Sequence, residues 1–287
     1  MFTGSYTALV TPFTADTSAI DYASLEKLLD WQLQAKVSGF VVGGTTGESA
    51  TLTKSERAEM LAFVIKFCSG KVPVIAGTGT NNTSTSIELT REAKSLGAAG
   101  ALCVNPYYNK PTQEGLYQHF KTIAEQGGLP VIVYNIPGRT SVDIGIETFS
   151  RLATVPGIVA VKEASGSANK IMWLAREIGA KVNLLSGEDD LTYMLMSVGG
   201  KGVISAAANV IPQAFVTICD TALKGDLSAA LNAQLKALPM IKALFLETNP
   251  APAKRALKHL GLIAHDTLRL PLVQVSEATD KALKDLL

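Results

Sequence analysis

Lys162 ends a short apolar run, a position where a lysine needs an explanation. Residues 158–162 read Ile-Val-Ala-Val-Lys, and a run this short and apolar predicts a strand buried on both faces. Burying an ammonium group is costly unless the group is paired or deprotonated. Lys162 is therefore either a side chain that reaches water from the strand end or an amine kept for chemistry. Its position alone leaves both interpretations open.

An amine kept at this position points to Schiff-base chemistry. A neutral amine attacks a ketone to form an imine, and the neighbouring carbon then loses a proton readily to give an enamine. At the ordinary lysine pKa near 10.4, only about one molecule in two thousand is neutral at pH 7. We expect burial, assisted by Arg139, to lower the pKa of Lys162, because both disfavour the ammonium form.

Hydroxyl groups elsewhere in the chain could move the protons that this chemistry requires. Tyr134 ends the apolar run before that of Lys162 and is the expected acid and base. Thr45 and Tyr108 are expected to pass its proton along a chain of hydroxyls. These three residues and Lys162 form the predicted catalytic set.

A glycine-rich segment, Gly43-Gly44-Thr45-Thr46-Gly47-Glu48, is a candidate anion site. Its glycines let the backbone approach a ligand, and its amides and the Thr45 and Thr46 hydroxyls are hydrogen-bond donors. A small carboxylate is the natural ligand for such a loop. A tight turn whose threonines satisfy local backbone groups is the alternative interpretation.

Other catalytic chemistries find little support in the sequence. His119, His259 and His265 lack HExxH spacing, and neither a GxSxG nor a GxxxxGK[ST] motif occurs. Gly77-Thr78-Gly79 lacks the third glycine and the downstream acidic residue of a dinucleotide loop. The three cysteines are far apart and predict buried free thiols rather than disulfides or metal ligands. We therefore expect neither a metal nor a cofactor.

Short apolar runs alternate with helix-period segments from the start of the chain. The eight runs span residues 6–10, 40–42, 72–76, 101–104, 131–134, 158–162, 182–185 and 202–205. Buried strands that alternate with helices in this way predict a (β/α)₈ TIM barrel rather than an open doubly wound sheet. The residues after the strands should then converge on one mouth, where such barrels carry their catalytic residues.

Capping residues mark the starts of several of the intervening helices. They are Asp21 or Ser24, Thr53, Thr83 and Thr112. Thr53 also has Glu56 three residues on, which predicts a capping box.

The strand pattern stops after residue 224. The helices expected beyond it span residues 227–246, 253–260 and 277–287, with proline breaks at 248–252 and 270–271. We expect a catalytic barrel over residues 1–224 and a C-terminal helical appendage over residues 225–287.

The composition restricts the kinds of partner. Of the 287 residues, 47% are hydrophobic and 18% charged, which is enough apolar material for a large core. The net charge is +1, from 26 basic and 25 acidic residues without a basic block, so we expect no nucleic-acid or membrane partner. Neither a signal-like N-terminus nor an apolar window of membrane length occurs, so we expect a cytoplasmic protein.

Four motifs in combination carry a resemblance to a known family: Gly44-Thr45-Thr46-Gly47-Glu48, Tyr107-Tyr108, Tyr134-Asn135-Ile136-Pro137-Gly138-Arg139-Thr140 and Val161-Lys162-Glu163-Ala164. Together they resemble the 4-hydroxy-tetrahydrodipicolinate synthase family of class I aldolase-type barrels. The resemblance extends over essentially the whole chain, including residues 247–252 and 268–271. It implies that pyruvate condenses with L-aspartate 4-semialdehyde, in the pathway to diaminopimelate and lysine.

The resemblance also implies roles for individual residues. Lys162 would form the imine with pyruvate, and Tyr134, Thr45 and Tyr108 would relay protons, with Tyr108 donated across a dimer interface. The implied substrate-binding residues are Thr46 for the pyruvate carboxylate, Arg139 for the carboxylate of the aldehyde, and Gly187 and Ile204 for backbone and shape.

Two alternatives to this function stay open. Lyases for sialic acid and 2-keto-3-deoxy sugar acids share the lysine and the tyrosine, and Arg139 is the residue that favours a carboxylate-bearing aldehyde. A catalytically silent barrel that only binds ligands is the second alternative. Enzymes of the resembled family are usually homotetramers, built as dimers of dimers.

Some members of the resembled family are inhibited by lysine at a dimer-interface site. The corresponding positions here are Ser49, Ala50, Lys54, Arg57, Asn81, Thr85 and Tyr107. Sensitive enzymes tend to carry a glutamate in place of Thr85 and histidines in place of Lys54 and Arg57. The cations of Lys54 and Arg57 and the absence of a carboxylate at Thr85 oppose lysine binding. Glu88, one helical turn after Thr85, could supply a carboxylate instead. We therefore expect weak or absent inhibition by lysine.

Overall fold

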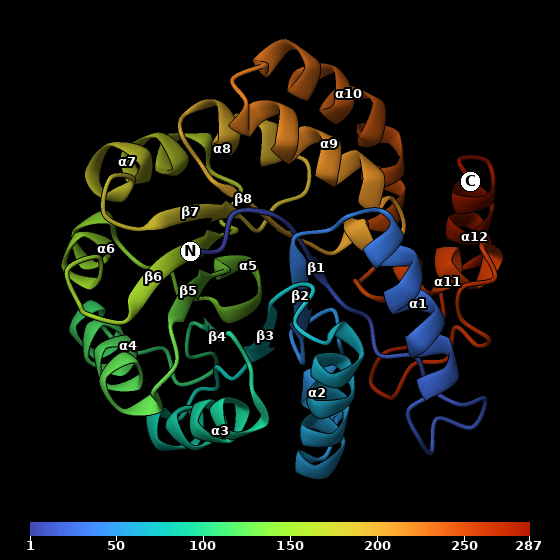
Figure 1. Cartoon of the computed structure of the whole chain (residues 1–287), viewed down its shortest axis with the longest axis horizontal. Helices are drawn as coiled ribbons and strands as arrows, with labels where there is room; N and C mark the ends of the chain where they lie inside the picture. Colours follow the sequence, from blue (N-terminus) through green and yellow to red (C-terminus); the bar gives the residue numbers. More distant parts are fainter.

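The computed structural model describes residues 1–287 and contains a closed barrel of eight parallel strands in sequence order (Figure 1). The strands are β1 (Gly4–Ala8), β2 (Gly39–Val42), β3 (Val74–Gly77), β4 (Gly100–Val104), β5 (Val131–Asn135), β6 (Ile158–Glu163), β7 (Asn183–Ser186) and β8 (Gly202–Ser205). Parallel neighbours need crossover connections, and helices on the outside of the barrel supply them (Figure 1). The predicted TIM barrel is confirmed.

Nine helices follow the strands and three more complete the chain. The first nine are α1 (Tyr22–Gln34), α2 (Lys54–Cys68), α3 (Thr83–Leu96), α4 (Gln113–Gly127), α5 (Pro137–Thr140), α6 (Ile146–Leu152), α7 (Ala168–Ile178), α8 (Thr192–Ser197) and α9 (Pro212–Leu223). The last three are α10 (Leu227–Leu244), α11 (Ala251–His259) and α12 (Glu277–Lys284). No helix is both long and apolar enough to span a membrane.

Side chains alternate between two cores along each strand. Val133 of β5 packs in the large core between strands and helices, whereas its neighbour Ile132 belongs to a smaller cluster inside the barrel. In β6, Val161 belongs to the outer core and Ala160 to the inner cluster. Because the strand period is two, Lys162 points into the barrel on the same side as Ala160.

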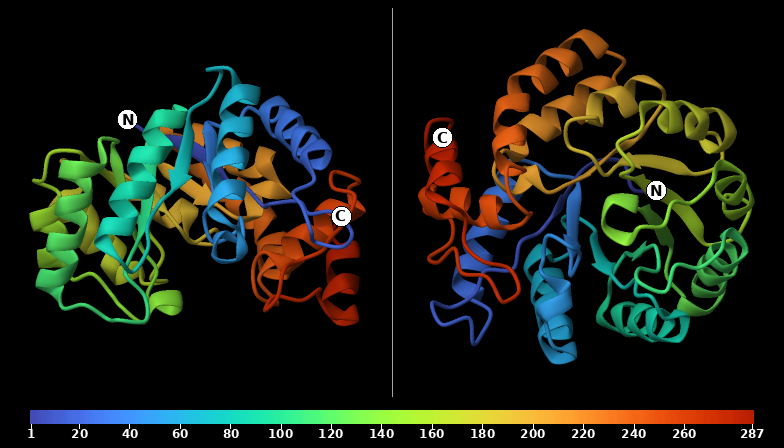
Figure 2. Two further views of the ribbon diagram at one scale, coloured as in Figure 1. Left: turned by 90° about the horizontal axis from the view of Figure 1, so that it is seen from below. Right: turned by 180° about the vertical axis from the view of Figure 1, so that it is seen from behind.

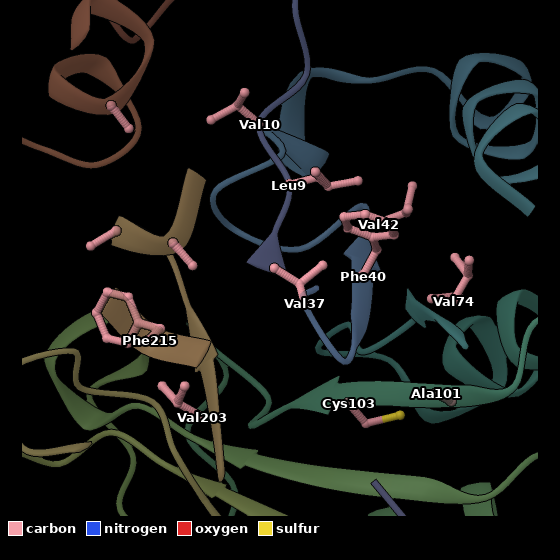
Figure 3. Close-up of a cluster of buried hydrophobic side chains, with 14 of the residues drawn as sticks. Leu9, Val10, Val37, Phe40, Val42, Val74, Ala101, Cys103, Val203 and Phe215 are labelled. Carbon is pink, nitrogen blue, oxygen red and sulfur yellow. The ribbon is translucent and has the colours of Figure 1, made fainter. Parts of the chain in front are cut away.

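Strand β1 ends two residues earlier than the apolar pattern predicts. Leu9 and Val10 are fully buried and lie in the core near Phe40 and Val42 (Figure 3). The backbone N–H of Val10, however, donates to Oδ1 of Asn209 at 3.1 Å rather than to a neighbouring strand. The apolar pattern therefore reports burial here and misses the point where strand pairing stops.

Strand β3 begins at Val74 rather than at residue 72. Pro73 has no N–H to donate to the sheet, and only its carbonyl takes part, accepting from the N–H of Phe40 at 3.1 Å. The strand then continues one residue further than predicted, to Gly77.

The predicted helix caps are confirmed at Asp21, Thr53 and Thr112. In the capping box of α2, Oγ1 of Thr53 accepts from the N–H of Glu56 at 3.2 Å. The prediction for α3 is wrong by one residue, since Asn82 caps the helix through its side chain. Asn82 precedes the first helical residue, Thr83, and so has the extended backbone that a cap requires.

Three helices lie in the region from residue 225 onward, as expected, but α11 begins at Ala251 and includes Pro252, because proline is tolerated in the first turn of a helix. Helix α10 packs along α9, and the segment around α11 and α12 lies beside α1 (Figure 1). Figure 2 shows this last part of the chain and α5 on the side of the barrel opposite the N-terminus. The C-terminal region therefore reaches the mouth formed by the ends of the strands.

Candidate active site

Lys162 lies inside the mouth of the barrel. Its side chain is buried, with 6% of the residue exposed, and in the ladder it stands opposite Tyr134. Its Nζ lies 4.0 Å from the centroid of the Tyr134 ring. Of the two interpretations that its position left open, a side chain reaching out to water is thereby ruled out.

The pKa of Lys162 is lowered to about 8, chiefly because burial disfavours the ammonium form. Arg139 lowers it further, as predicted, while Asp189 and Glu188 act in the opposite direction. About one molecule in ten then carries a neutral amine at pH 7, far more than for an ordinary lysine. The amine is prepared for nucleophilic attack.

Tyr134 remains protonated at neutral pH. Burial raises the pKa of its phenol above the usual range, against the smaller effects of Arg139 and of a hydrogen bond with the Thr45 side chain. Its hydroxyl therefore has a proton to give, and Thr45 is within hydrogen-bonding reach to exchange it.

The glycine-rich loop after β2 brings Thr46 into the site. Thr46 is buried, and its Oγ1 accepts a hydrogen bond from Nδ2 of Asn249 at 2.9 Å. That bond uses a lone pair and leaves the hydroxyl hydrogen of Thr46 free to donate. The arrangement suits a ligand that accepts hydrogen bonds, such as a carboxylate.

A buried ion pair anchors the end of this loop. Glu48, whose φ of 54° lies in the left-handed region, accepts from Nζ of Lys254 at 2.5 Å, and both side chains are fully buried. The second carboxylate oxygen of Glu48 accepts from the N–H of Arg269 at 3.1 Å. Two residues of the C-terminal region thus hold the loop in place.

Arg139 lies on α5, just beyond β5. Its guanidinium donates through Nη2 to the carbonyl oxygen of Asn249 at 3.4 Å, and the residue is otherwise open to solvent. Most of its donors are therefore available to a ligand.

One cavity of about 340 Å³ unites these groups. The predicted site residues that line it are Lys162, Tyr134, Thr45, Thr46, Arg139, Gly187 and Ile204. At Gly187 a Cβ atom would lie 2.9 Å from Cε of Lys162 and 2.7 Å from Cβ of Ala164, so the absence of a side chain leaves room for the lysine.

Tyr108 is the one predicted catalytic residue outside this cavity. It is 90% exposed, with a φ of 73°, and Tyr107 beside it is exposed too. Within a single chain Tyr108 does not complete the hydroxyl relay, and its role stays a prediction.

Three residues at the site were not assigned a role from the sequence: Glu188, Asp189 and Asn249. Asp189 is buried, and its Oδ2 accepts from the N–H of Ala207 at 2.8 Å. Burial raises the pKa of Asp189 to about 6. Glu188 and Asp189 come two and three residues after β7, so the expected convergence of the residues after the strands places them at the mouth without giving them a role, whereas Asn249 follows no strand.

A buried hydrogen-bond network also fixes the strand ends. Nδ2 of Asn135 donates to Oε2 of Glu163 at 3.1 Å, and Oδ1 of Asn135 accepts from Nδ2 of Asn105 at 2.9 Å. Because Asn135 follows Tyr134 and Glu163 follows Lys162, this network positions the two strands that carry the reactive side chains.

A second cavity of about 560 Å³ adjoins the first and shares Thr45, Ile136, Arg139 and Asn249 with it. Of the residues predicted for a lysine site, Ser49, Ala50, Arg57 and Tyr107 line this cavity, and Lys54, Asn81 and Thr85 do not. Nη2 of Arg57 donates to the carbonyl of Gly77 at 2.9 Å, while the Lys54 side chain is 75% exposed near Glu92.

The remaining predictions concern groups away from the site. All three cysteines are free and buried, as expected. No three His, Cys, Asp or Glu side chains are grouped as metal ligands. Gly77 lets the end of β3 pack closely against the loop after β2, because a Cβ there would lie 2.3 Å from the carbonyl oxygen of Gly43.

Comparison with known proteins places the whole chain beside one group of enzymes. The model of the dihydrodipicolinate synthetase family matches residues 1–287. The chain is 47% identical over 287 residues to the 4-hydroxy-tetrahydrodipicolinate synthase of Kosmotoga olearia, covering 99% of this chain and 97% of that one.

Solved structures give the same result. The dihydrodipicolinate synthase of Thermotoga maritima superposes with a TM-score of 0.97 at 43% identity, covering 100% of this chain and 97% of that one. The chloride-inhibited dihydrodipicolinate synthase of Acinetobacter baumannii, in complex with pyruvate, gives a TM-score of 0.97 at 42% identity, covering 100% and 98%.

Proposed function

The chain belongs to the dihydrodipicolinate synthetase family, and on that premise we propose that it condenses pyruvate with L-aspartate 4-semialdehyde to 4-hydroxy-tetrahydrodipicolinate. The activity is that of a lyase in diaminopimelate and lysine biosynthesis. The observation that carries the proposal is the buried amine of Lys162, 4.0 Å from the Tyr134 ring in a cavity that also holds Thr46 and Arg139.

The reaction begins at Lys162. Its neutral amine attacks the keto carbon of pyruvate, and loss of one water gives an imine. Tyr134 gives its proton to the departing water, and the resulting phenolate takes a methyl proton of pyruvate, so that the electrons of that C–H bond form the enamine. Tyr134 and Thr45 carry the protons, which is consistent with the protonated phenol and its hydrogen bond with Thr45.

Carbon–carbon bond formation follows. The enamine carbon attacks the aldehyde carbon, and the oxygen that becomes negative takes a proton from Tyr134. The ammonium group of the former aldehyde substrate then loses a proton to the Tyr134 phenolate, and the neutral amine attacks the imine carbon, closing a ring as the bond to Lys162 breaks. The water lost at the imine step is the only by-product, and no cofactor takes part.

Two carboxylates must be held during these steps. Thr46 and the amides of its loop bind the carboxylate of pyruvate, for which the free hydroxyl hydrogen of Thr46 is suited. Arg139 binds the carboxylate of the aldehyde substrate, since a guanidinium can hold a carboxylate through two parallel hydrogen bonds. Gly187 and Ile204 shape the space beside Lys162.

A homotetramer would complete the site. The exposed Tyr108 reaches the hydroxyl relay only if a second chain brings it there, which supports a dimer as the catalytic unit. We place this assembly, a dimer of dimers, in the cytoplasm. Light scattering of the purified protein and of a Tyr108→Phe variant measures the mass of each assembly. The activity of the variant tests whether the Tyr108 hydroxyl takes part in the relay.

Borohydride trapping is the decisive experiment on the chemistry. Reduction in the presence of pyruvate should leave a stable adduct on Lys162, located by peptide mapping. The rate of pyruvate consumption in the presence of L-aspartate 4-semialdehyde is then compared with its rate in the presence of the aldehydes that sialic-acid and 2-keto-3-deoxy sugar-acid aldolases use. A preference for the sugars would overturn the assigned substrate, and the absence of an adduct would indicate a barrel that only binds ligands.

A further inference from the structure

Glu188 is the only acidic residue among those that line the Lys162 cavity. The cations in the same lining are Lys162 and Arg139. The amine of Lys162 becomes part of the imine and Arg139 faces a substrate carboxylate; Glu188 influences the pKa of Lys162 but forms an ion pair with neither cation. Glu188 needs a partner of its own.

The barrel order sets Glu188 and Arg139 on opposite sides of the lysine. β6, which carries Lys162, pairs with β5 on one side and with β7 on the other. Arg139 follows β5, and Glu188 follows β7 two residues after the strand ends. A molecule standing over Lys162 therefore meets a guanidinium from one neighbouring strand and a carboxylate from the other.

The backbone of Glu188 is fixed while its carboxylate is free. Its carbonyl oxygen accepts from Oγ of Ser186 at 2.7 Å and from Oγ1 of Thr192 at 3.2 Å. The preceding N–H, that of Gly187, donates to the carbonyl of Glu163 at 2.7 Å. The carboxylate itself makes no hydrogen bond or ion pair within the chain, although the residue is partly buried.

The surroundings leave this carboxylate short of positive charge. Burial, Asp190 and Asp189 raise the pKa of Glu188 to about 7, and Lys162 only partly offsets them. An added cation at this position would therefore be held favourably. Glu188 and Phe245 also line an outer cavity of about 670 Å³ against α10, and the cation in that lining, Lys242, forms no ion pair with Glu188.

We propose that Glu188 binds the α-ammonium group of the aldehyde substrate while Arg139 holds its carboxylate, so that Glu188 selects an amino-acid aldehyde. This inference rests on the proposed function. An α-amino acid carries both charges on one carbon, which matches a cavity that presents one group of each sign beside the amine. A sugar aldehyde has no ammonium group to offer and gains less from a carboxylate here.

The test compares two aldehydes that differ only in the amino group: L-aspartate 4-semialdehyde and succinic semialdehyde. Pyruvate consumption in a single turnover is measured for the wild type, for Glu188→Gln, and for Asp190→Asn as matched control. Asp190 is an exposed acidic neighbour that lines the outer cavity and not the inner one. Borohydride trapping with pyruvate checks in each variant that Lys162 still forms the imine.

Glu188→Gln should lower the single-turnover second-order rate constant about 10- to 100-fold with the amino aldehyde, the range expected for a lost charged hydrogen bond, and change it less than threefold with succinic semialdehyde. Asp190→Asn should change either value less than threefold, because losing its charge favours the ionised carboxylate of Glu188 and removes no contact of the inner cavity. Equal losses with both aldehydes, or an unaltered preference in Glu188→Gln, would overturn the role of Glu188. If the wild type consumes no pyruvate with L-aspartate 4-semialdehyde, the proposed function fails first and the inference with it.

Discussion

Asn249 donates from Nδ2 to Oγ1 of Thr46 at 2.9 Å across 203 residues of sequence. The backbone carbonyl of Asn249 accepts from Nη2 of Arg139 at 3.4 Å. One residue of the C-terminal region thus touches both side chains to which we assign the two substrate carboxylates. The appendage is part of the site and does more than cover the barrel.

Asn249→Ala should weaken pyruvate binding more than aldehyde binding. The substitution removes the side-chain donor that orients Thr46 and keeps the backbone carbonyl that Arg139 contacts. Loss of one neutral hydrogen bond predicts a rise of about 2- to 10-fold in the KM for pyruvate, with a smaller change for the aldehyde. Steady-state kinetics with each substrate varied in turn measures both values.

Substitutions at Thr46 serve as controls for this prediction. Thr46→Ser keeps the hydroxyl and should retain most activity, whereas Thr46→Val should raise the KM for pyruvate at least as much as Asn249→Ala. Equal increases in both KM values in Asn249→Ala would contradict a specific effect on Thr46.

The rate of imine formation should rise with pH and level off above pH 8. Only the neutral amine of Lys162 is nucleophilic, and burial places its pKa at about 8, so the reactive fraction grows about tenfold per pH unit below that value. Borohydride trapping at short times with pyruvate, from pH 6 to about pH 10, measures the rate. Lys162→Ala should abolish nearly all turnover.

Neighbouring charges should move that midpoint in opposite directions. Asp189 raises the pKa of Lys162 and Arg139 lowers it, so Asp189→Asn should shift the profile to lower pH and Arg139→Ala to higher pH. A profile that both variants leave in place would show that the midpoint belongs to another group.

Arg139→Ala should chiefly impair use of the aldehyde. Removing a charged partner of the substrate carboxylate predicts a fall of about 10- to 100-fold in kcat/KM for L-aspartate 4-semialdehyde, while pyruvate still forms the imine. The assay is repeated with an uncharged aldehyde. If that aldehyde loses as much as the charged one, Arg139 acts on the fold or on Lys162 and not on the carboxylate.

The reactive centre could be predicted from the sequence because its signal is local. Lys162 and Tyr134 each end an apolar run, and a period of two together with the strand-end rule sends both side chains into the same mouth. The same rule reaches Glu188, but only the cavity and its neighbours give that carboxylate a role.

Contacts made late in the chain could not be predicted this way. The prolines of residues 248–252 and their place in the family resemblance mark the segment without giving Asn249 a role, and its contact with Thr46 arises only when the C-terminal region packs on the mouth. The points where strands end could not be predicted for a related reason. Apolar residues indicate burial, and Val10 is buried while its N–H is bonded to Asn209 outside the ladder.

Lysine should inhibit this enzyme weakly or not at all. Arg57 adds a cation to the second cavity, Lys54 adds another on the nearby surface of α2, and Thr85 offers no carboxylate. We expect full activity at micromolar lysine in an assay that follows pyruvate consumption. Half-inhibition at such concentrations would refute this prediction, and Glu88→Gln would then reveal whether that glutamate supplies the missing charge.

Lys254→Met should destabilise the fold more than a surface substitution of the same kind. Nζ of Lys254 bonds to Glu48 at 2.5 Å and to the carbonyl of Thr267 at 2.7 Å, and both charged side chains are fully buried. Removing the lysine leaves the Glu48 carboxylate buried without its cation, which predicts a loss of about 3–5 kcal/mol in the free energy of unfolding. Denaturant titration measures that loss, with Lys284→Met on the exposed end of α12 as the control that should change little. Adding Glu48→Gln to Lys254→Met should recover part of the stability, because the unpaired carboxylate charge is then gone. A double variant no more stable than Lys254→Met alone would contradict the assignment of the loss to that buried charge.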